Sequence, residues 1–139
     1  MKERVIALGF FDGVHLGHGA LLRRAAEEAA LRGCTPAVFT FDRPPKEVVT
    51  GVPCPLINSP EDRRDLVRRL YRIQDVLMVP FDREMMTTPW DDFIVRILVG
   101  RYHAVHLVAG HDHHFGHRNQ GTPELLAQKC AQLGLGCDI

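Results

Sequence analysis

The sequence predicts an α/β protein with a Rossmann-like, doubly wound parallel sheet and helices on both faces. Short apolar runs alternate along the chain with amphipathic or charged segments, and each run is continuously apolar rather than alternating in polarity. Such runs are typical of strands that are covered on both sides. Strands that alternate with helices pair in parallel through right-handed crossovers. The 139 residues are expected to form one domain with its own core.

Five apolar runs are the predicted strands. They are RVIALGF, TPAVFTF, DVLMVPF and AVHLVAG, which begin at residues 4, 35, 75 and 104, and the short CDI at residues 137–139. Their length and their valine content favour strand over helix. We therefore expect these five segments to form the sheet.

The first predicted helix covers Leu16–Arg32 and ends at Gly33. Three later helices are predicted where a hydroxyl residue precedes a proline, because Ser and Thr are favoured at the N-cap and proline at the first helical position. These pairs are Ser59-Pro60, Thr88-Pro89 and Thr122-Pro123. The first two also place an acid at the third helical position, as in a capping box. On the helix after Ser59, the expected apolar stripe is Leu66, Val67, Leu70 and Tyr71.

The longest segment with no expected helix or strand is Asp42–Ser59. A connection of that length in a compact domain is usually functional or mobile.

Composition and charge narrow the classes of partner. The chain has 17 Lys and Arg against 17 Asp and Glu, with a pI near 7.1, so nothing indicates a nucleic-acid or membrane partner. No run approaches the roughly 18 apolar residues of a membrane span, and the run after Arg4 is too short for a signal peptide. The four cysteines form no C-x-x-C pair, which is typical of free thiols. We expect a cytoplasmic protein.

An acidic residue follows each of the four long predicted strands, where ligands bind in open parallel sheets. These residues are Asp12, Asp42, Asp82 and Asp112. Taken singly, each aspartate is most simply interpreted as a residue that caps or turns the chain. Four of them beside a histidine-bearing glycine loop indicate a binding site at this edge of the sheet.

The glycine loop is GFFDGVHLGHG, Gly9–Gly19, between the first strand and the first helix. This is the context of a phosphate-binding loop, although neither G-x-G-x-x-G nor G-x-x-x-x-G-K-[ST] is present. His15 and His18 are three residues apart, so they can share one face at the helix start. The helix N-terminus attracts anions, and Gly13 and Gly17 allow close backbone approach. We expect both histidines to stabilise a phosphate whose charge grows during transfer.

GFFDGVHLGH resembles the signature of the His-x-Gly-His nucleotidyltransferase superfamily. It is most similar to the FMN adenylyltransferase module of prokaryotic bifunctional riboflavin kinase/FAD synthetases. Three further segments agree with that family in order and spacing: TFDRPPKEV, VPFDREMMTTPWDDFI with an expected buried Phe93, and VAGHDHHFGHRNQG. The resemblance spans essentially the whole chain, and its first and last motifs are the specific ones.

The resemblance implies transfer of the adenylyl group of ATP to FMN, giving FAD and pyrophosphate, by direct in-line attack of the FMN phosphate. Mg²⁺ would accompany the nucleotide, and no other metal site is expected. His15 and His18 would be the catalytic residues. The residues implied at the nucleotide are Gly9, Phe10, Phe11, Asp12, Gly13, Gly17 and Gly110. Those implied at the flavin are Asp112, Phe115 and Gly116.

The sequence departs from the family pattern in three ways. Pro44 stands where the family has a histidine, and His113 stands where it has an aromatic residue after Asp112. The family's Ser-Ser-Thr-x-x-Arg motif and its riboflavin kinase domain are absent up to Ile139. The resemblance therefore predicts a nucleotidyltransferase domain over residues 1–139 that is truncated at its C-terminus. It also implies a riboflavin kinase domain as a partner in the natural chain.

Other functions stay open. The chain could be a nucleotidyltransferase for another small phosphate, such as that of pantetheine or glycerol, or a binding domain for nucleotide or flavin without activity. The Phe-Asp-Gly-Val-His form favours flavin. The histidine-rich loop at residues 111–117 could chelate a transition metal, but adjacent loop residues rarely converge on one ion. Packing roles are expected for Trp90, Cys130 and Cys137.

Overall fold

The computed structural model describes residues 2–11, 16–53 and 59–139, with the backbone alone at 16–17 and 46–48. One parallel sheet has the strand order β3-β2-β1-β4-β5. Its strands are β1 (Arg4–Leu8), β2 (Thr35–Phe41), β3 (Asp75–Val79), β4 (Ala104–Ala109) and β5 (Gly136–Asp138). This is the order expected of a doubly wound Rossmann-like sheet. The fold class and all five strands are confirmed.

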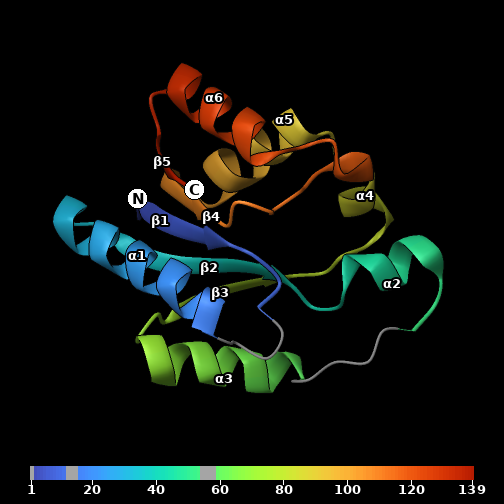
Figure 1. Cartoon of the computed structure of the whole chain (residues 1–139), viewed down its shortest axis with the longest axis horizontal. Coiled ribbons are helices and arrows are strands. Elements are labelled where there is room, and N and C mark those ends of the chain that lie inside the picture. Colours follow the sequence, from blue (N-terminus) through green and yellow to red (C-terminus); the bar gives the residue numbers. More distant parts are fainter. Residues whose placement is uncertain (1, 12–15, 54–58) are drawn as a thin grey trace.

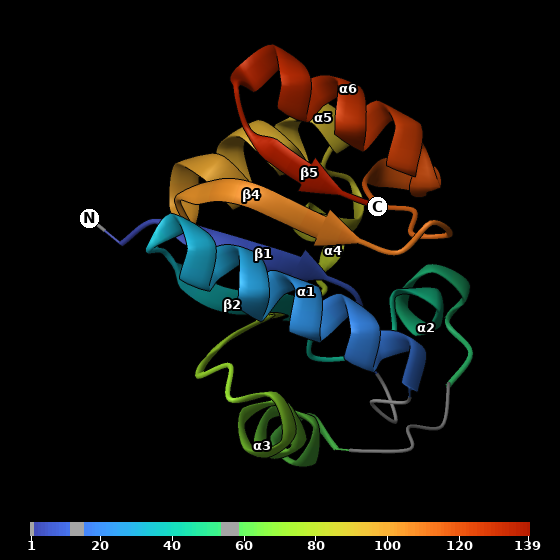
Figure 2. The ribbon, with the colours of Figure 1, turned by 60° about the vertical axis from the view of Figure 1, so that its left-hand side comes forward.

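Helices cover both faces of the sheet (Figures 1 and 2). The main ones are α1 (Leu16–Arg32), α3 (Pro60–Tyr71), α5 (Trp90–Asp92) with the π-helix η1 (Phe93–Arg101), and α6 (Pro123–Leu133). Along β1, Val5 and Ala7 belong to a buried cluster that includes residues of α1 and α3. Ile6 and Leu8 belong to a second buried cluster with residues of η1 and α6. Alternate residues of β1 thus pack against helices on opposite faces of the sheet.

Two of the three predicted hydroxyl caps are confirmed. Ser59 Oγ accepts a hydrogen bond from Asp62 N at 3.1 Å and begins α3. Thr122 Oγ1 accepts one from Leu125 N at 3.2 Å and begins α6. Each satisfies one of the backbone N–H groups that a helix start leaves without a partner. The predicted end of α1 is also confirmed, because Gly33 follows it with φ of 67°.

The third predicted cap, Thr88, is wrong. The residue at the start of α5 is Pro89, which forms no side-chain cap. Thr88 Oγ1 instead donates to the carbonyl oxygen of Glu84 at 2.8 Å, in the short helix α4 (Arg83–Met86). The last carbonyls of a helix have no partner inside it, and the hydroxyl bonds one of them before the chain turns into α5.

The expectation of no helix between Asp42 and Ser59 is also wrong, because α2 (Pro45–Thr50) lies there. Its signals are ordinary: a proline at its first position, and Gly51 after its end with φ of 72°. In Figure 1, α2 lies beyond the carboxyl ends of the strands, on the same side as α4. The two short helices thus flank the edge at which a ligand is expected.

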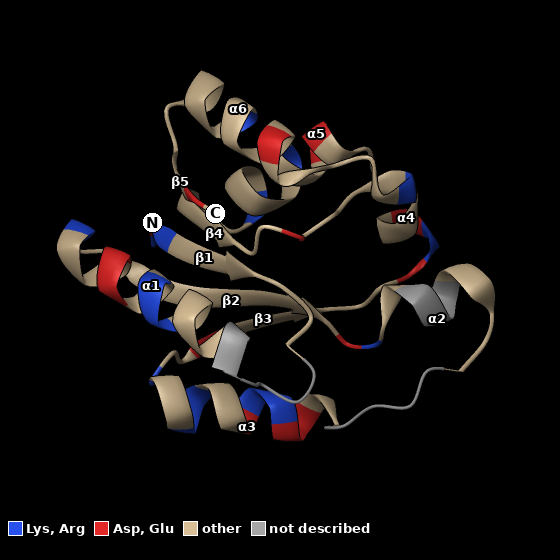
Figure 3. Cartoon of the chain, viewed as in Figure 1, with Lys and Arg blue, Asp and Glu red and all other residues tan. Residues whose placement is uncertain are grey.

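Charged residues of both signs lie mainly on the helices and loops, and few lie on the strands (Figure 3). Arg and Glu alternate on α1, and Arg and Asp on α3. Within the described part of the chain, no helix combines the length and the apolar character needed to cross a membrane.

Candidate active site

A cavity of about 210 Å³ lies at the carboxyl ends of β1, β2 and β3. Six of the seven phenylalanines of the chain line it: Phe10, Phe39, Phe41, Phe81, Phe93 and Phe115. Several of the rings meet edge to face. The Phe41 and Phe81 centroids are 4.8 Å apart at 67°, and those of Phe39 and Phe93 are 5.4 Å apart at 82°. Aromatic pairs favour this arrangement, so the rings hold one another in place around the cavity.

One wall of the cavity is the loop that follows β4. The rings of His113 and Phe115 are stacked, with centroids 5.9 Å apart at 15°. Burial lowers the pKa of His113 to about 4, against an opposing effect of the Asp112 carboxylate. The imidazole is therefore neutral at pH 7. It extends the aromatic wall and still has one N–H donor and one acceptor.

The same loop is fastened to α5. Phe115 and Gly121 exchange two backbone hydrogen bonds, at 3.2 and 2.8 Å. Gly116 has φ of 77°, and a Cβ there would lie 2.6 Å from the Cα of Trp90. Only glycine fits at this position. His117 N donates to the Thr88 carbonyl oxygen at 2.8 Å, and together these contacts keep Phe115 facing the cavity.

The turn after β1 directs its two phenylalanines to different places. Phe11 has φ of 61°, and its ring is buried with the cluster under α1. The ring of His18, in the first turn of α1, meets the ring of Phe11 edge to face at 5.0 Å. A Cβ on Gly9 would lie 2.7 Å from the Phe11 ring. Phe10 lines the cavity, so this turn joins the cavity to the start of α1.

The structure brings together some of the predicted site residues. Gly9, Phe10, Phe115 and Gly116 line the cavity. Phe11 is 2% exposed, so its side chain has almost no free surface for a ligand. Gly110 and Asp112 follow β4 but do not line the cavity. Asp12, Gly13 and His15 lie outside the described residues, and only the backbone of Gly17 is described, within α1.

Of the three strand-end aspartates that the structure describes, two use their carboxylates to bond backbone N–H groups. Asp42 Oδ1 accepts a hydrogen bond from Phe81 N at 3.1 Å. Asp82 Oδ1 accepts one from Met85 N at 2.9 Å and caps α4. For these two, the simpler interpretation of an aspartate that turns or caps the chain holds. The phenylalanines beside them, Phe41 and Phe81, are the residues that reach the cavity.

Sequence reasoning missed four of the lining phenylalanines and one buried cation. The missed rings belong to Phe39, Phe41, Phe81 and Phe93, although the burial expected of Phe93 is confirmed, at 4% exposed. The sequence held a signal for two of them, because a phenylalanine directly precedes the strand-end acid at positions 41 and 81. The buried cation is Arg63 of α3, which is 1% exposed.

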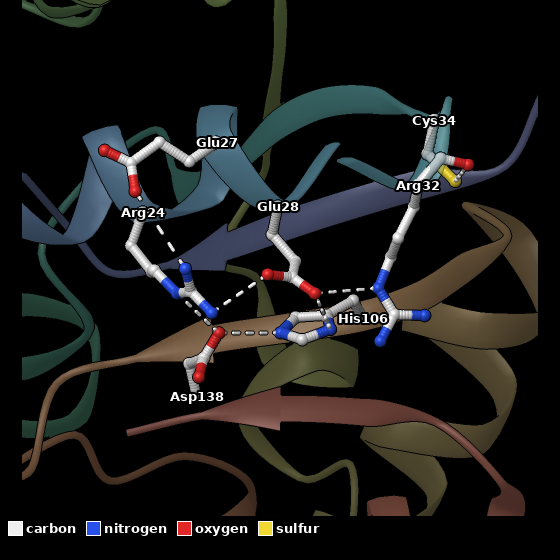
Figure 4. Close-up of polar contacts among 7 residues, drawn as sticks. All are labelled: Arg24, Glu27, Glu28, Arg32, Cys34, His106 and Asp138. Carbon is white, nitrogen blue, oxygen red and sulfur yellow. Dashed lines mark hydrogen bonds and ion pairs between the residues drawn. The ribbon is translucent and has the colours of Figure 1, made fainter. Parts of the chain in front are cut away.

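A second polar cluster links α1, β4 and β5 (Figure 4). His106 Nε2 lies 2.9 Å from Asp138 Oδ2, and its Nδ1 lies 3.6 Å from Glu28 Oε1. These three residues are the one group in the described chain with suitable ligand atoms close enough to hold a metal. Arg24 already bridges the two carboxylates, at 2.9 Å from Glu28 and 3.0 Å from Asp138. Because that guanidinium supplies the positive charge, we interpret the cluster as a set of structural contacts that hold β5 against α1 and β4.

None of the three residues of this cluster lines the cavity. Glu28 lies ten residues beyond His18 on α1, which corresponds to about 15 Å along a helix. Among the described residues, the histidine-rich loop at 111–117 brings no three ligand atoms close enough together to hold a metal ion. Nothing in this geometry supports a metal there.

Comparison with known proteins gives one consistent family. Residues 1–139 match the family model described as FAD synthetase. The bifunctional riboflavin kinase/FMN adenylyltransferase of Escherichia coli K12 is 35% identical over 137 residues, covering 97% of this chain and 42% of that protein. The protein of the same description from Listeria monocytogenes is 33% identical over 128 residues, covering 91% and 40%. The chain thus spans about two fifths of the length of these relatives.

A solved structure shares the fold. It is described as a macrolide-efflux protein from Streptococcus pneumoniae and is 25% identical, with a TM-score of 0.81. The similarity covers 99% of this chain and 44% of that one.

Proposed function

Because the chain belongs to the FAD synthetase family of nucleotidyltransferases, we propose that it transfers the adenylyl group of ATP to FMN and releases pyrophosphate. The observation that carries this proposal is the phenylalanine-lined cavity, which adjoins the turn leading into α1. A flat apolar ring system suits the cavity, and anionic phosphates suit the N-terminus of α1. FMN has both parts in one molecule.

The size of the cavity supports the binding of only one part of FMN inside it. At about 210 Å³, it is below the roughly 300–1,000 Å³ of pockets that hold a whole drug-sized ligand. We infer that it receives the isoalloxazine ring alone, between the phenylalanines and the His113–Phe115 wall. The ribityl phosphate would then extend past Phe10 towards α1. His113 would offer its one N–H or its acceptor to the polar edge of the flavin.

The chemistry needs no protein nucleophile. A phosphate oxygen of FMN attacks the α-phosphorus of ATP in line, while the bond from that phosphorus to the pyrophosphate oxygen breaks. The protein then contributes positioning and charge stabilisation. The N–H groups at the start of α1 and the imidazole of His18 would supply hydrogen bonds to the phosphates, and His15 is proposed for the same role.

Mg²⁺ would arrive with ATP and share the charge of its phosphates. The described strand-end carboxylates are poorly suited to hold it alone, because Asp42 and Asp82 already accept backbone hydrogen bonds. We therefore assign no protein ligand to the ion. We also propose that residues 1–139 form one nucleotidyltransferase domain of a cytoplasmic enzyme, and that a riboflavin kinase activity, as named in the relatives, supplies its FMN.

Incubation with ATP, Mg²⁺ and FMN, followed by chromatography for FAD, tests the proposal. We expect His18→Ala to lower the turnover number by about 10²-fold, the scale for loss of one charge-stabilising donor. His103→Asn is the matched control. His103 lies at the amino end of β4 with φ of 58°, which asparagine tolerates. Unchanged turnover in His18→Ala would refute the assigned role.

A binding domain without activity is the second candidate, since the chain spans about two fifths of its relatives. FMN that binds with no FAD formed would favour that function. Failure of the full natural chain to bind FMN would exclude both.

A further inference from the structure

Arg63 is buried beneath the carboxyl ends of β1 and β2. It heads the set of large, fully buried side chains, at 1% exposure, and it lies on α3. Burying a guanidinium is costly unless its N–H groups find acceptors. Its Nη1 donates to the Phe10 carbonyl oxygen at 2.9 Å and to Thr40 Oγ1 at 3.3 Å. Its Nη2 lies 3.4 Å from the carbonyl oxygen of Asp42. The side chain thus ties the ends of two strands to α3.

Several of these contacts involve Phe10. The guanidinium carbon of Arg63 lies 4.2 Å from the centroid of the Phe10 ring, a distance at which a cation and an aromatic face attract. Thr40 Oγ1 donates to the same Phe10 carbonyl oxygen at 2.8 Å. Arg63 therefore holds both the backbone and the ring of Phe10. Phe10 lines the cavity with its ring, and its backbone belongs to the turn after β1.

Packing alone does not explain an arginine at this position. Val67, one turn further along α3, is also 1% exposed and joins α3 to the buried cluster by apolar contact. An apolar residue at position 63 could extend that contact without the cost of burying a charge. The planar fork of arginine is required only if several acceptors must be held together.

We propose that Arg63 is a positioning residue for adenylyl transfer, acting through Phe10. It fixes the wall between the flavin cavity and the start of α1, and so sets the distance from the flavin ring to the phosphates. The inference rests on the proposed function. Neither lysine nor methionine can replace this role, because lysine has no planar fork and methionine has no donor.

The test uses the whole chain with Arg63→Lys and Arg63→Met, and with Val67→Ala as the matched control on the same helix. Turnover number and KM for ATP and FMN are measured by FAD formation, at a temperature where each variant is folded. We expect both Arg63 variants to lower kcat/KM for FMN by about 10-fold or more, the scale for hydrogen bonds to a charged group. Val67→Ala should lower the melting temperature comparably and leave kcat/KM within about twofold.

Hydrogen exchange gives a readout that does not depend on activity. The amides of residues 9–11 should exchange faster in the Arg63 variants than in the wild type or in Val67→Ala. If the wild type makes no FAD, the proposed function fails, and the exchange result still decides whether Arg63 holds this turn. If both Arg63 variants fail to fold, kcat/KM for FMN and hydrogen exchange at residues 9–11 are measured instead on Thr40→Val, which removes one hydrogen bond to Phe10.

A double-mutant cycle with Phe10→Leu separates positioning from general stability. If Arg63 acts through Phe10, Arg63→Lys should cost little kcat/KM in the Phe10→Leu background. Equal cost in both backgrounds would overturn the proposal. Unchanged exchange at residues 9–11, or activity loss in Val67→Ala proportional to its loss of stability, would overturn it as well.

Discussion

Replacing Asp138 by asparagine should destabilise the fold at neutral pH by loosening β5. Asp138 Oδ2 is bonded to His106 Nε2 at 2.9 Å and to Arg24 Nε at 3.0 Å. Burial raises the pKa of the Asp138 carboxyl, and the hydrogen bonds from His106 and Arg24 outweigh it, so the pKa lies below its ordinary value. Asparagine keeps the shape of the side chain and removes its negative charge.

The magnitude follows from the exposure of the group. Hydrogen bonds to a charged group contribute about 1.5–3 kcal/mol when buried. The Asp138 side chain is 32% exposed, and solvent screening reduces the contribution to about 1–2 kcal/mol. For a domain of this size, each kcal/mol shifts the melting temperature by about 2–4 °C. We therefore expect Asp138→Asn to melt about 2–8 °C below the wild type at pH 7.

The dependence on pH has a definite sign. A carboxyl group with a depressed pKa in the folded state stabilises the fold above its unfolded pKa, about 3.9, and loses that contribution as the pH falls through the folded value. The melting temperature of Asp138→Asn, measured by circular dichroism, should lie below that of the wild type at pH 7. This difference in melting temperature should become smaller as the pH falls below about 4. Asp65→Asn, exposed on α3, is the control. Equal melting temperatures for the two variants at pH 7, or a deficit that does not narrow, would refute the reasoning.

Three further predictions concern the loop after β4 and the helix caps. Gly116→Ala should lower the free energy of unfolding in urea by at least about 2 kcal/mol, because its Cβ would lie 2.6 Å from the Cα of Trp90. Gly134→Ala is the control, since Gly134 has a similar φ and no atom within 4 Å of the added Cβ, and it should lower the free energy of unfolding by only about 1 kcal/mol. Because the pKa of His113 is lowered to about 4, the unfolded chain binds more protons between pH 4 and about 6.5, so stability should rise with pH in that range and His113→Phe should flatten the rise. An NMR titration midpoint near 6.5 for His113 would contradict this. Ser59→Ala and Thr122→Ala should each cost about 1 kcal/mol in urea unfolding, and a smaller loss would show that water replaces the cap.

Predicting the fold from the sequence succeeded where a local rule decides the structure. Continuous apolar runs gave all five strands, and a hydroxyl before a proline gave the starts of α3 and α6. The rule failed at Thr88, because the carbonyl of Glu84 from the preceding helix competes for the same hydroxyl. The stripe on α3 was partly wrong: Val67 is buried, but Leu70 is 57% exposed. Arg63 lies one turn before Val67, on the buried side of that helix.

The candidate site was harder to predict from the sequence than the fold, because its residues come from separate elements. Phe39 lies within β2, Phe93 begins η1, and Phe115 follows β4. Each looks like an ordinary core residue until the sheet order brings them to one cavity. A charged residue such as Arg63 is usually exposed, and only its tertiary contacts identify it as buried.

The charges at this edge of the sheet are arranged differently from what the sequence suggests, and the arrangement fits the anionic substrates that we propose. Four acids at the strand ends suggest a negative site, which would repel the ATP and FMN of the proposed reaction. In the structure, Asp42 and Asp82 direct their charge into backbone N–H groups. Arg63 places a buried positive charge against the turn after β1, and the N-terminus of α1 adds partial positive charge. Asp42 and Asp82 thus shape the loops, while Arg63 and the start of α1 would supply the positive potential that the proposed phosphates require.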